Sequence, residues 1–205
     1  MGSSYEKTHS DILKSAKKNF MENGFERSNL RKICKDANIT TGAFYRHFED
    51  KEAVFIEIVS PVLAELKKMY LESEKESYNI LENSEIEKIW DVNQNGIMPF
   101  IEFIYDNYSE IKLLLLSSDG TKYENFLHDI SEIETKKTLK YINAMRKKGY
   151  KVHDISEKEI HMIVQAYFSS VFEVVVHDYT KEDAIAYTKT LVKFFAPGWK
   201  NILSD

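Results

Sequence analysis

The sequence predicts an all-α protein in which a small N-terminal helix-turn-helix domain precedes a larger helical domain. Glycine and proline are scarce, with seven and three in 205 residues, so few positions interrupt a helix. Apolar residues recur at helical spacing over several long stretches, and no alternating pattern of useful length indicates a strand. Three short predicted helices come first and longer ones follow. We therefore expect a first domain over residues 1–51 and a second over residues 52–205.

The first helix is predicted over roughly residues 8–23. Ile12, Ala16 and Phe20 recur on one of its faces. The pair Asn23-Gly24 is typical of a helix C-terminus, which ends the pattern there.

The second and third helices are the two arms of the expected helix-turn-helix. Ser28 is a suitable N-cap for a second helix that ends near Ala37. Thr40 can cap a short third helix, in which Phe44 and Phe48 form an i, i+4 pair that faces inward. Two helices joined by so short a turn are typical of this motif.

The remaining helices are longer. Asp50 is expected to cap a fourth helix, which should kink or break at Pro61. Further helices are predicted over residues 62–78, 97–108, 110–116, 123–148, 156–177 and 181–195. The segments at 97–108 and 110–116 also fit one bent helix, and the last helix should stop before Pro197-Gly198.

Charge is distributed unevenly along the chain. The net charge is −5 overall, but residues 1–51 carry ten Lys or Arg against seven Asp or Glu, a net of +3, whereas the remainder carries −8. A basic first quarter in an acidic protein favours a polyanion as its partner, although a charge this small also fits an ordinary solvated face.

Several function classes lack support in the sequence. It holds no dinucleotide-binding motif, phosphate-binding loop or nucleophile elbow, so an enzyme is not indicated. The single cysteine, Cys34, excludes a disulfide framework and a cysteine-based zinc site, and His128, His161 and His177 lack metal-ligand spacing. We expect no cofactor and no metal. Without a long apolar run or a secretory signal, we also expect no membrane partner and a cytoplasmic location.

The third predicted helix carries side chains suited to DNA, because the second arm of such a motif enters the major groove. Gly42 weakens the helix but lets the backbone approach a phosphate or a base edge. Tyr45 and Lys51 suit phosphates, and Arg46 suits a phosphate or a guanine. A merely hydrated surface is the alternative. The expected contacts are Thr40, Thr41, Gly42, Ala43, Tyr45, Arg46, His47 and Lys51.

The first quarter of the chain resembles the N-terminal module of the TetR family of bacterial transcriptional regulators. The resemblance covers residues 12–55 and is carried by the Phe-x-x-x-Gly-Phe run that ends at Phe25 and by the Gly-x-Phe-Tyr-x-His-Phe-x-x-Lys-Glu signature from Gly42 to Glu52. Asn38 replaces a common glycine before the turn, where asparagine can adopt the same left-handed conformation. By this resemblance, Ser28 joins Thr40 as a helix-capping phosphate contact.

The resemblance implies a dimeric repressor, less often an activator, that binds a palindromic double-stranded DNA operator and is released by a small-molecule effector. A helical ligand carrier or adaptor without sequence-specific DNA binding is the alternative. A second apolar stripe on the last two helices is expected to form the homodimer interface, although a large core would explain it too. Its residues are Phe168, Phe172, Val176, Leu191, Phe194 and Phe195.

The middle helices are rich in aromatic residues, which predicts a partly apolar or aromatic effector if they enclose a pocket rather than a packed core. The expected effector contacts are Trp90, Phe103, Tyr108, Tyr123, Phe126 and Tyr167.

Overall fold

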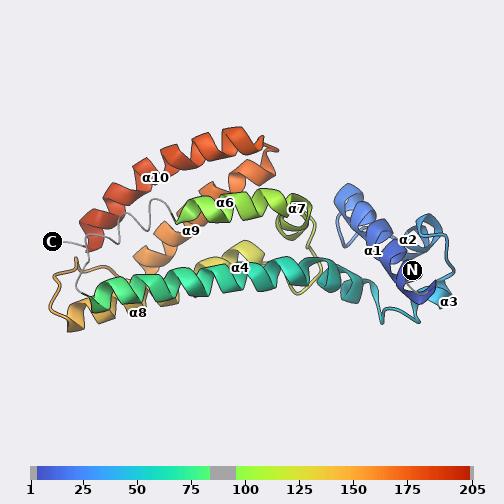
Figure 1. The fold of residues 1–205 in the computed structure, drawn as a ribbon, viewed down its shortest axis with the longest axis horizontal. Coiled ribbons are helices and arrows are strands. Elements are labelled where there is room, and N and C mark those ends of the chain that lie inside the picture. The colour runs from blue at the N-terminus through green and yellow to red at the C-terminus, as the bar shows by residue number, and fades with distance from the viewer. Residues whose placement is uncertain (1–3, 84–95, 204–205) are drawn as a thin grey trace. The chain divides into compact units, whose positions relative to one another are not determined.

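A computed structural model describes residues 4–83 and 96–203. Every secondary-structure element assigned in these residues is a helix, which confirms the predicted fold class. The chain divides into two compact units (Figure 1). Unit one comprises residues 1–65 and 107–125, and unit two comprises residues 66–106 and 126–205. These units are defined by compactness alone, so the functional division expected between residues 51 and 52 stays a prediction.

Unit one contains the helix-turn-helix. Its helices are α1 (Ser4–Asn23), α2 (Leu30–Asp36), α3 (Thr41–Phe44), the first part of α4 (Lys51–Glu82) and α7 (Tyr108–Leu116). Helix α1 packs on α2 and α7, and α2 packs on α3. The rings of Phe20, Phe25 and Phe55 meet in the core with centroids 5.4 to 5.6 Å apart. The apolar face predicted from Ile12, Ala16 and Phe20 is fully buried.

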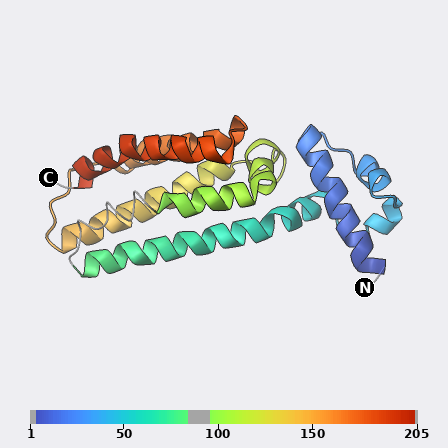
Figure 2. The same ribbon diagram turned by 45° about the horizontal axis from the view of Figure 1, so that its top comes forward.

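Unit two is a bundle of longer helices. It contains the rest of α4, α6 (Ile97–Asp106), α8 (Phe126–Lys147), α9 (Glu157–Val176) and α10 (Lys181–Leu203). Helix α8 packs along α9, and α10 packs on α6 and α9, as Figure 1 and Figure 2 show. A buried core joins α4, α8, α9 and α10 through Leu81, Ile142, Met145, Ile160, Val164 and Leu203.

The expected stop before Pro197 was wrong, and Pro61 does not break the helix that contains it, whereas a kink at Pro61 stays a prediction. Helix α4 continues through Pro61 to Glu82, and α10 continues through Pro197 to Leu203. A proline removes one backbone hydrogen bond, but packing on its flanks can hold the helix together. Val59 and Val62 are buried beside the exposed Pro61, and Leu203 is buried beyond Pro197.

Helix α9 is long and apolar enough to cross a membrane by length and composition. Core helices pass the same test, and α9 supplies Ile160, Val164 and Val171 to the buried interior. This observation is therefore weak support for a membrane span.

Candidate nucleic-acid interface and cavity

The first arm of the motif, α2, begins one residue later than predicted. Asn29 is the N-cap of α2, and its side chain accepts a hydrogen bond from the Arg31 amide at 2.8 Å. Ser28 is buried instead, and its hydroxyl donates to the carbonyls of Asn19 and Gly24 at 3.0 and 2.7 Å. Ser28 therefore ties α1 to the start of α2, and its hydroxyl faces away from solvent.

The turn before α3 has the geometry that the sequence predicts. Asn38 adopts a φ of 57°, the left-handed conformation that asparagine tolerates. Thr40 is the N-cap of α3, and its side chain accepts a hydrogen bond from the Ala43 amide at 3.1 Å. Helix α3 is shorter than predicted, but hydrogen bonds carry helical turns on as far as Phe48, whose amide donates to the Phe44 carbonyl.

Helix α3 presents a clear division between inward and outward side chains. Phe44 and Phe48 are buried, as predicted, whereas Thr41, Gly42, Tyr45 and Arg46 are exposed, and Ala43 is half-buried. A Cβ atom added at Gly42 would lie no closer than 3.9 Å to its nearest neighbour, the Thr40 hydroxyl. The protein itself therefore does not require glycine there, which leaves close approach of an external molecule as a reason for it.

His47 is less accessible than predicted. It is half-buried, and its ring stacks on that of Tyr5 with centroids 4.1 Å apart. Burial and the neighbouring His9 lower the pKa of His47, which favours the neutral ring. His9 in turn lies 2.5 Å from the Glu57 carboxylate. This ring cluster joins the first turns of α1 to the end of the α3 segment.

Lys51 holds the chain around the α1–α2 connection. Its ammonium donates to three backbone carbonyls, those of Phe25, Glu26 and Ser28, at 2.6, 3.2 and 3.0 Å. It also lies 4.2 Å from the centre of the Phe25 ring. Three bonds use every donor of an ammonium. Burial lowers the pKa of Lys51, and nearby Glu26 raises it to a smaller extent.

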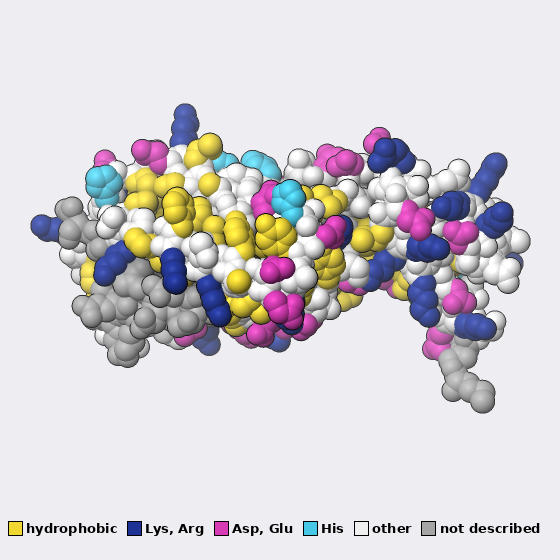
Figure 3. Space-filling model, turned by 90° about the horizontal axis from the view of Figure 1, so that it is seen from above, with side chains coloured by type: hydrophobic (Ala, Val, Ile, Leu, Met, Phe, Trp, Pro, Cys, Tyr) yellow, Lys and Arg dark blue, Asp and Glu magenta, His cyan; other side chains and the backbone are white. Residues whose placement is uncertain are grey.

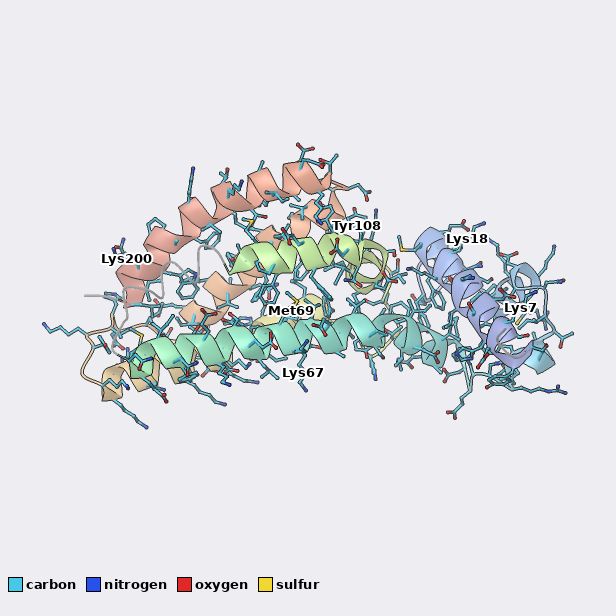
Figure 4. All side chains as sticks on the ribbon, in the orientation of Figure 1. Lys7, Lys18, Lys67, Met69, Tyr108 and Lys200 are labelled. Atoms are coloured by element: carbon cyan, nitrogen blue, oxygen red, sulfur yellow. The ribbon has the colours of Figure 1, made fainter. Side chains whose placement is uncertain are left out.

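Basic side chains are distributed over the exposed faces of the first two helices. Figure 3 shows Lys and Arg side chains over these helices, on the right of the view, with acidic side chains interspersed. Lys7 and Lys18 on α1 are labelled in Figure 4. The exposed cations of α1 and α2 are Lys7, Lys14, Lys18, Arg31, Lys32 and Lys35. The mixed signs agree with the small net charge of this part of the sequence.

Unit two contains a cavity of about 240 Å³. Side chains from α4, α8, α9 and α10 line it, and most of them are aromatic or carry a hydroxyl. The lining residues are Tyr70, Ser73, Glu74, Ser77, Tyr78, Glu134, Lys137, Thr138, Tyr141, Val164, Tyr167, Phe168, Val192, Phe195, Ala196, Trp199 and Leu203.

The charged groups of the cavity differ in how they are compensated. Lys137 forms an ion pair with Glu74 at 2.5 Å. Burial raises the pKa of Glu134 to about 7, a shift that Thr138 and Lys137 only partly oppose. Burial also raises the pKa values of Tyr141 and Tyr167 to about 12. Within the described part of the chain, no group of three or more His, Cys, Asp or Glu side chains could hold a metal ion.

The structure brings one predicted effector contact, Tyr167, to this cavity. Phe126 is buried against Phe172, and Tyr123 lies in unit one, 6.4 Å from the Phe55 ring. Phe103 and Tyr108 are half-buried and do not line the cavity. Trp90 lies outside the described residues.

Sequence reasoning missed most of the aromatic lining. Tyr70 and Tyr78 are eight residues apart, and Glu134 and Tyr141 seven, so each pair shares a helix face. This spacing was a usable signal, but it does not tell which faces meet.

The predicted dimer residues are divided between the interior and the surface. Phe172 and Leu191 are buried in the single chain, while Phe168 and Phe195 line the cavity. Phe194 and Val176 are exposed, Phe194 to 76%. Figure 3 shows apolar side chains gathered on one face of the helical body. Only these two of the six are exposed, whereas Phe168 and Phe195 are half-buried, so the interface stays a prediction.

Comparison with known proteins places the helix-turn-helix in a family. Residues 12–58 match bacterial regulatory proteins of the tetR family. The regulator UidR of Escherichia coli K12 is 40% identical over 52 residues, which are 25% of this chain and 26% of that protein. The probable acrEF/envCD operon repressor of the same strain is 36% identical over 67 residues, 32% of this chain and 30% of the other.

The chain thus spans only about a quarter of the length of the first curated relatives it matches. Over nearly the whole length, the fold is similar to that of NalD from Pseudomonas aeruginosa, described as the secondary repressor of the MexAB-OprM multidrug efflux pump. The TM-score is 0.55, with 15% sequence identity and 98% of each chain covered. Over its N-terminal segment, this chain is therefore similar to the tetR family of bacterial regulatory proteins.

Proposed function

We propose that this protein is a ligand-responsive transcriptional repressor that binds a palindromic DNA operator as a dimer. The observation that carries the proposal is the arrangement of α3, in which Phe44 and Phe48 are buried while Thr41, Tyr45 and Arg46 are exposed. A helix fixed from behind in this way can present its outer side chains to the major groove in one orientation. Two of the similar proteins are described as repressors, which favours repression over activation.

The exposed residues are suited to different parts of a duplex. Thr41, Gly42 and Ala43 lie at the start of α3, the end that contacts base edges in this motif. Thr40, Tyr45 and Arg46 are exposed beside them and suit phosphate oxygens, with a guanine as a second choice for the arginine.

Ser28, His47 and Lys51 differ from that set because their polar groups already face protein atoms or are partly buried. We assign them a positioning role, in which they hold the turn and helix that contact DNA.

The cavity of unit two supports the effector part of the proposal. An effector that binds one arrangement of the dimer better than the other would shift the protein toward the arrangement with low affinity for the operator. Phe194, exposed on α10, and Val176 are the side chains that we propose to meet the second subunit, which would give two reading heads for a palindrome.

Selection on random duplex DNA, with purified full-length protein at a fixed salt concentration, tests the proposal. We expect enrichment of a palindrome. Thr41→Ala should change the selected sequence, whereas Tyr45→Ala should weaken binding to selected and random DNA alike. Equal losses on both DNA types for both variants would contradict this division of roles.

A ligand carrier without sequence-specific DNA binding is the second candidate, because the cavity by itself fits one. Selection would then return no sequence above background while a small molecule still binds in unit two. That pair of results would replace the regulator proposal.

A further inference from the structure

The cavity of unit two has a chemical character that points to one class of ligand. We infer that the effector is a small organic cation with an apolar or aromatic body, held by the Glu134 carboxylate and the surrounding aromatic rings. The inference rests on the proposed function only for the consequence at DNA. Binding itself can be measured without DNA.

The first argument for a cationic ligand is the charge balance of the cavity. Of its three charged side chains, Glu74 and Lys137 already neutralise one another at 2.5 Å. Glu134 forms no ion pair within the described residues, and its only hydrogen bond there is a long one of 3.4 Å from the Thr138 hydroxyl. An ionised carboxylate that is enclosed without a partner is unfavourable. A cation that binds in the cavity would supply the opposite charge that the protein does not provide.

The enclosure of Glu134 makes that gain larger. Its side chain keeps some accessible surface because it faces the cavity, yet protein atoms surround it and disfavour the charged form. In a site that excludes bulk water, attraction between opposite charges is stronger than at an exposed surface.

The second argument for a cationic ligand is the aromatic lining of the cavity. The faces of aromatic rings attract cations, most strongly when water is excluded. Lys137 shows the interaction already, because its ammonium lies 4.0 Å from the centre of the Tyr70 ring. Across the cavity, Tyr167 meets Phe195 edge to face at 5.2 Å, and Trp199 completes the lining. These rings would surround the body of a ligand whose charge reaches Glu134.

The volume of the cavity limits the size of the ligand. Pockets for drug-sized molecules are about 300 to 1,000 Å³, so a cavity of 240 Å³ suits a molecule with one ring or two small ones. The buried Tyr70 hydroxyl has no hydrogen-bond partner within the described residues and could bond a polar group of the ligand.

Other ligand classes fit less well. An organic anion would meet one carboxylate more than there are ammonium groups, and the single ammonium is already paired. A neutral aromatic molecule would contact the same rings but would leave the Glu134 carboxylate uncompensated.

The test compares ligands that share one skeleton and differ in charge. The cations 2-phenylethylammonium and benzyltrimethylammonium, neutral 2-phenylethanol and anionic phenylacetate are titrated into the full-length protein. The Trp90→Phe background makes Trp199 the only tryptophan, so its fluorescence reports on the cavity. Calorimetry on the unmodified chain checks the stoichiometry. We expect both cations to bind with a dissociation constant below about 1 mM and at least about tenfold more tightly than the other two.

Glu134→Gln keeps the shape of the side chain and removes its charge. It should weaken binding of both cations about ten- to a hundredfold, because bonds to charged groups are the stronger ones, and it should not weaken binding of 2-phenylethanol, which leaves that charge uncompensated. Asp129→Asn, an exposed carboxylate on the same helix, is the matched control and should change nothing. Thermal unfolding of both variants establishes that they fold.

Three results would overturn the inference. They are absence of saturable binding by either cation, binding of 2-phenylethanol or phenylacetate as tight as that of the cations, and unchanged cation affinity in Glu134→Gln. If the cations bind as expected but selected DNA is not released, the ligand class stands and the regulatory proposal fails. If no DNA is selected at all, the binding comparison still decides the ligand class.

Discussion

An enclosed charged side chain has internal hydrogen-bond partners in the helix-turn-helix but almost none in the cavity. In unit one, the Lys51 ammonium donates to three carbonyls and uses all its hydrogen-bonding capacity within the protein. In unit two, the Glu134 carboxylate faces a cavity with one weak hydrogen bond and no ion pair within the described residues. The comparison teaches that a charged side chain serves structure where its partners are internal, and can serve binding where they are missing.

The largest expected effect is on the inward face of the recognition helix. Phe44→Ala should lower the free energy of unfolding by about 3 to 5 kcal/mol, because it removes a fully buried ring from a small core. Specific DNA binding should be lost with it. Urea denaturation followed by circular dichroism measures the change, and Tyr45→Ala, at the exposed neighbour, is the control that should leave stability nearly unaltered. Similar losses in both variants would contradict the division of faces.

Lys51→Met tests the structural half of the comparison. It leaves three carbonyls without their donor, so we expect a loss of about 2 to 3 kcal/mol in the free energy of unfolding, measured without DNA. Lys14→Met removes an exposed charge on α1 and should cost little. If Lys51→Met were as stable as the parent but less sensitive to salt in DNA binding, Lys51 would be a phosphate contact after all.

The pH dependence of the free energy of unfolding tests the second part of the comparison, the enclosed carboxylate of Glu134. Burial raises the pKa of Glu134 to about 7, above that of an unfolded glutamate, so the folded chain keeps this proton where the unfolded chain has lost it. This contribution to the free energy of unfolding is complete below a pH of about 4 and is lost as pH rises to about 7, on the order of 2 to 3 kcal/mol. The difference in the free energy of unfolding between the parent and Glu134→Gln, taken at each pH, separates this contribution from the titration of other groups. Parallel curves for the two proteins would exclude the shift.

The smallest expected effect concerns a single hydroxyl on the outward face. Tyr45→Phe should weaken binding to selected and random DNA by about 1 kcal/mol, roughly fivefold, because one phosphate hydrogen bond is lost. Fluorescence anisotropy at fixed salt measures both affinities. A loss confined to the selected sequence would place the hydroxyl on a base instead.

Local patterns in the sequence predicted the parts of the fold that depend on one helix at a time. Helical spacing identified the buried face of α1 and the inward pair Phe44 and Phe48, because that spacing depends only on neighbouring residues. The cap of α2 was misplaced by one residue since serine and asparagine are equally good caps. Contacts of Ser28 with α1 decided between them, and such contacts are not local.

The cavity could not be predicted in the same way. Its walls come from four helices, and the lining residues range from Tyr70 on α4 to Leu203 on α10, so their identity depends on how the helices pack. Aromatic content pointed to Phe103 and Tyr108, yet the tyrosines that line the cavity are mainly those of α4 and α8. The extension of α10 past Pro197 brings in Trp199, which a helix ending at residue 195 would have left out.

The enclosed carboxylate of unit two also has a calorimetric consequence. Near neutral pH, Glu134 is protonated in part of the molecules, and a bound cation would expel that proton into the buffer. The measured heat of binding should therefore vary with the ionisation enthalpy of the buffer, and the slope counts the protons released. On the proposed mode of binding, this slope lies between zero and one, falls as pH rises, and vanishes in Glu134→Gln. Each ligand cation that binds would therefore release at most one proton.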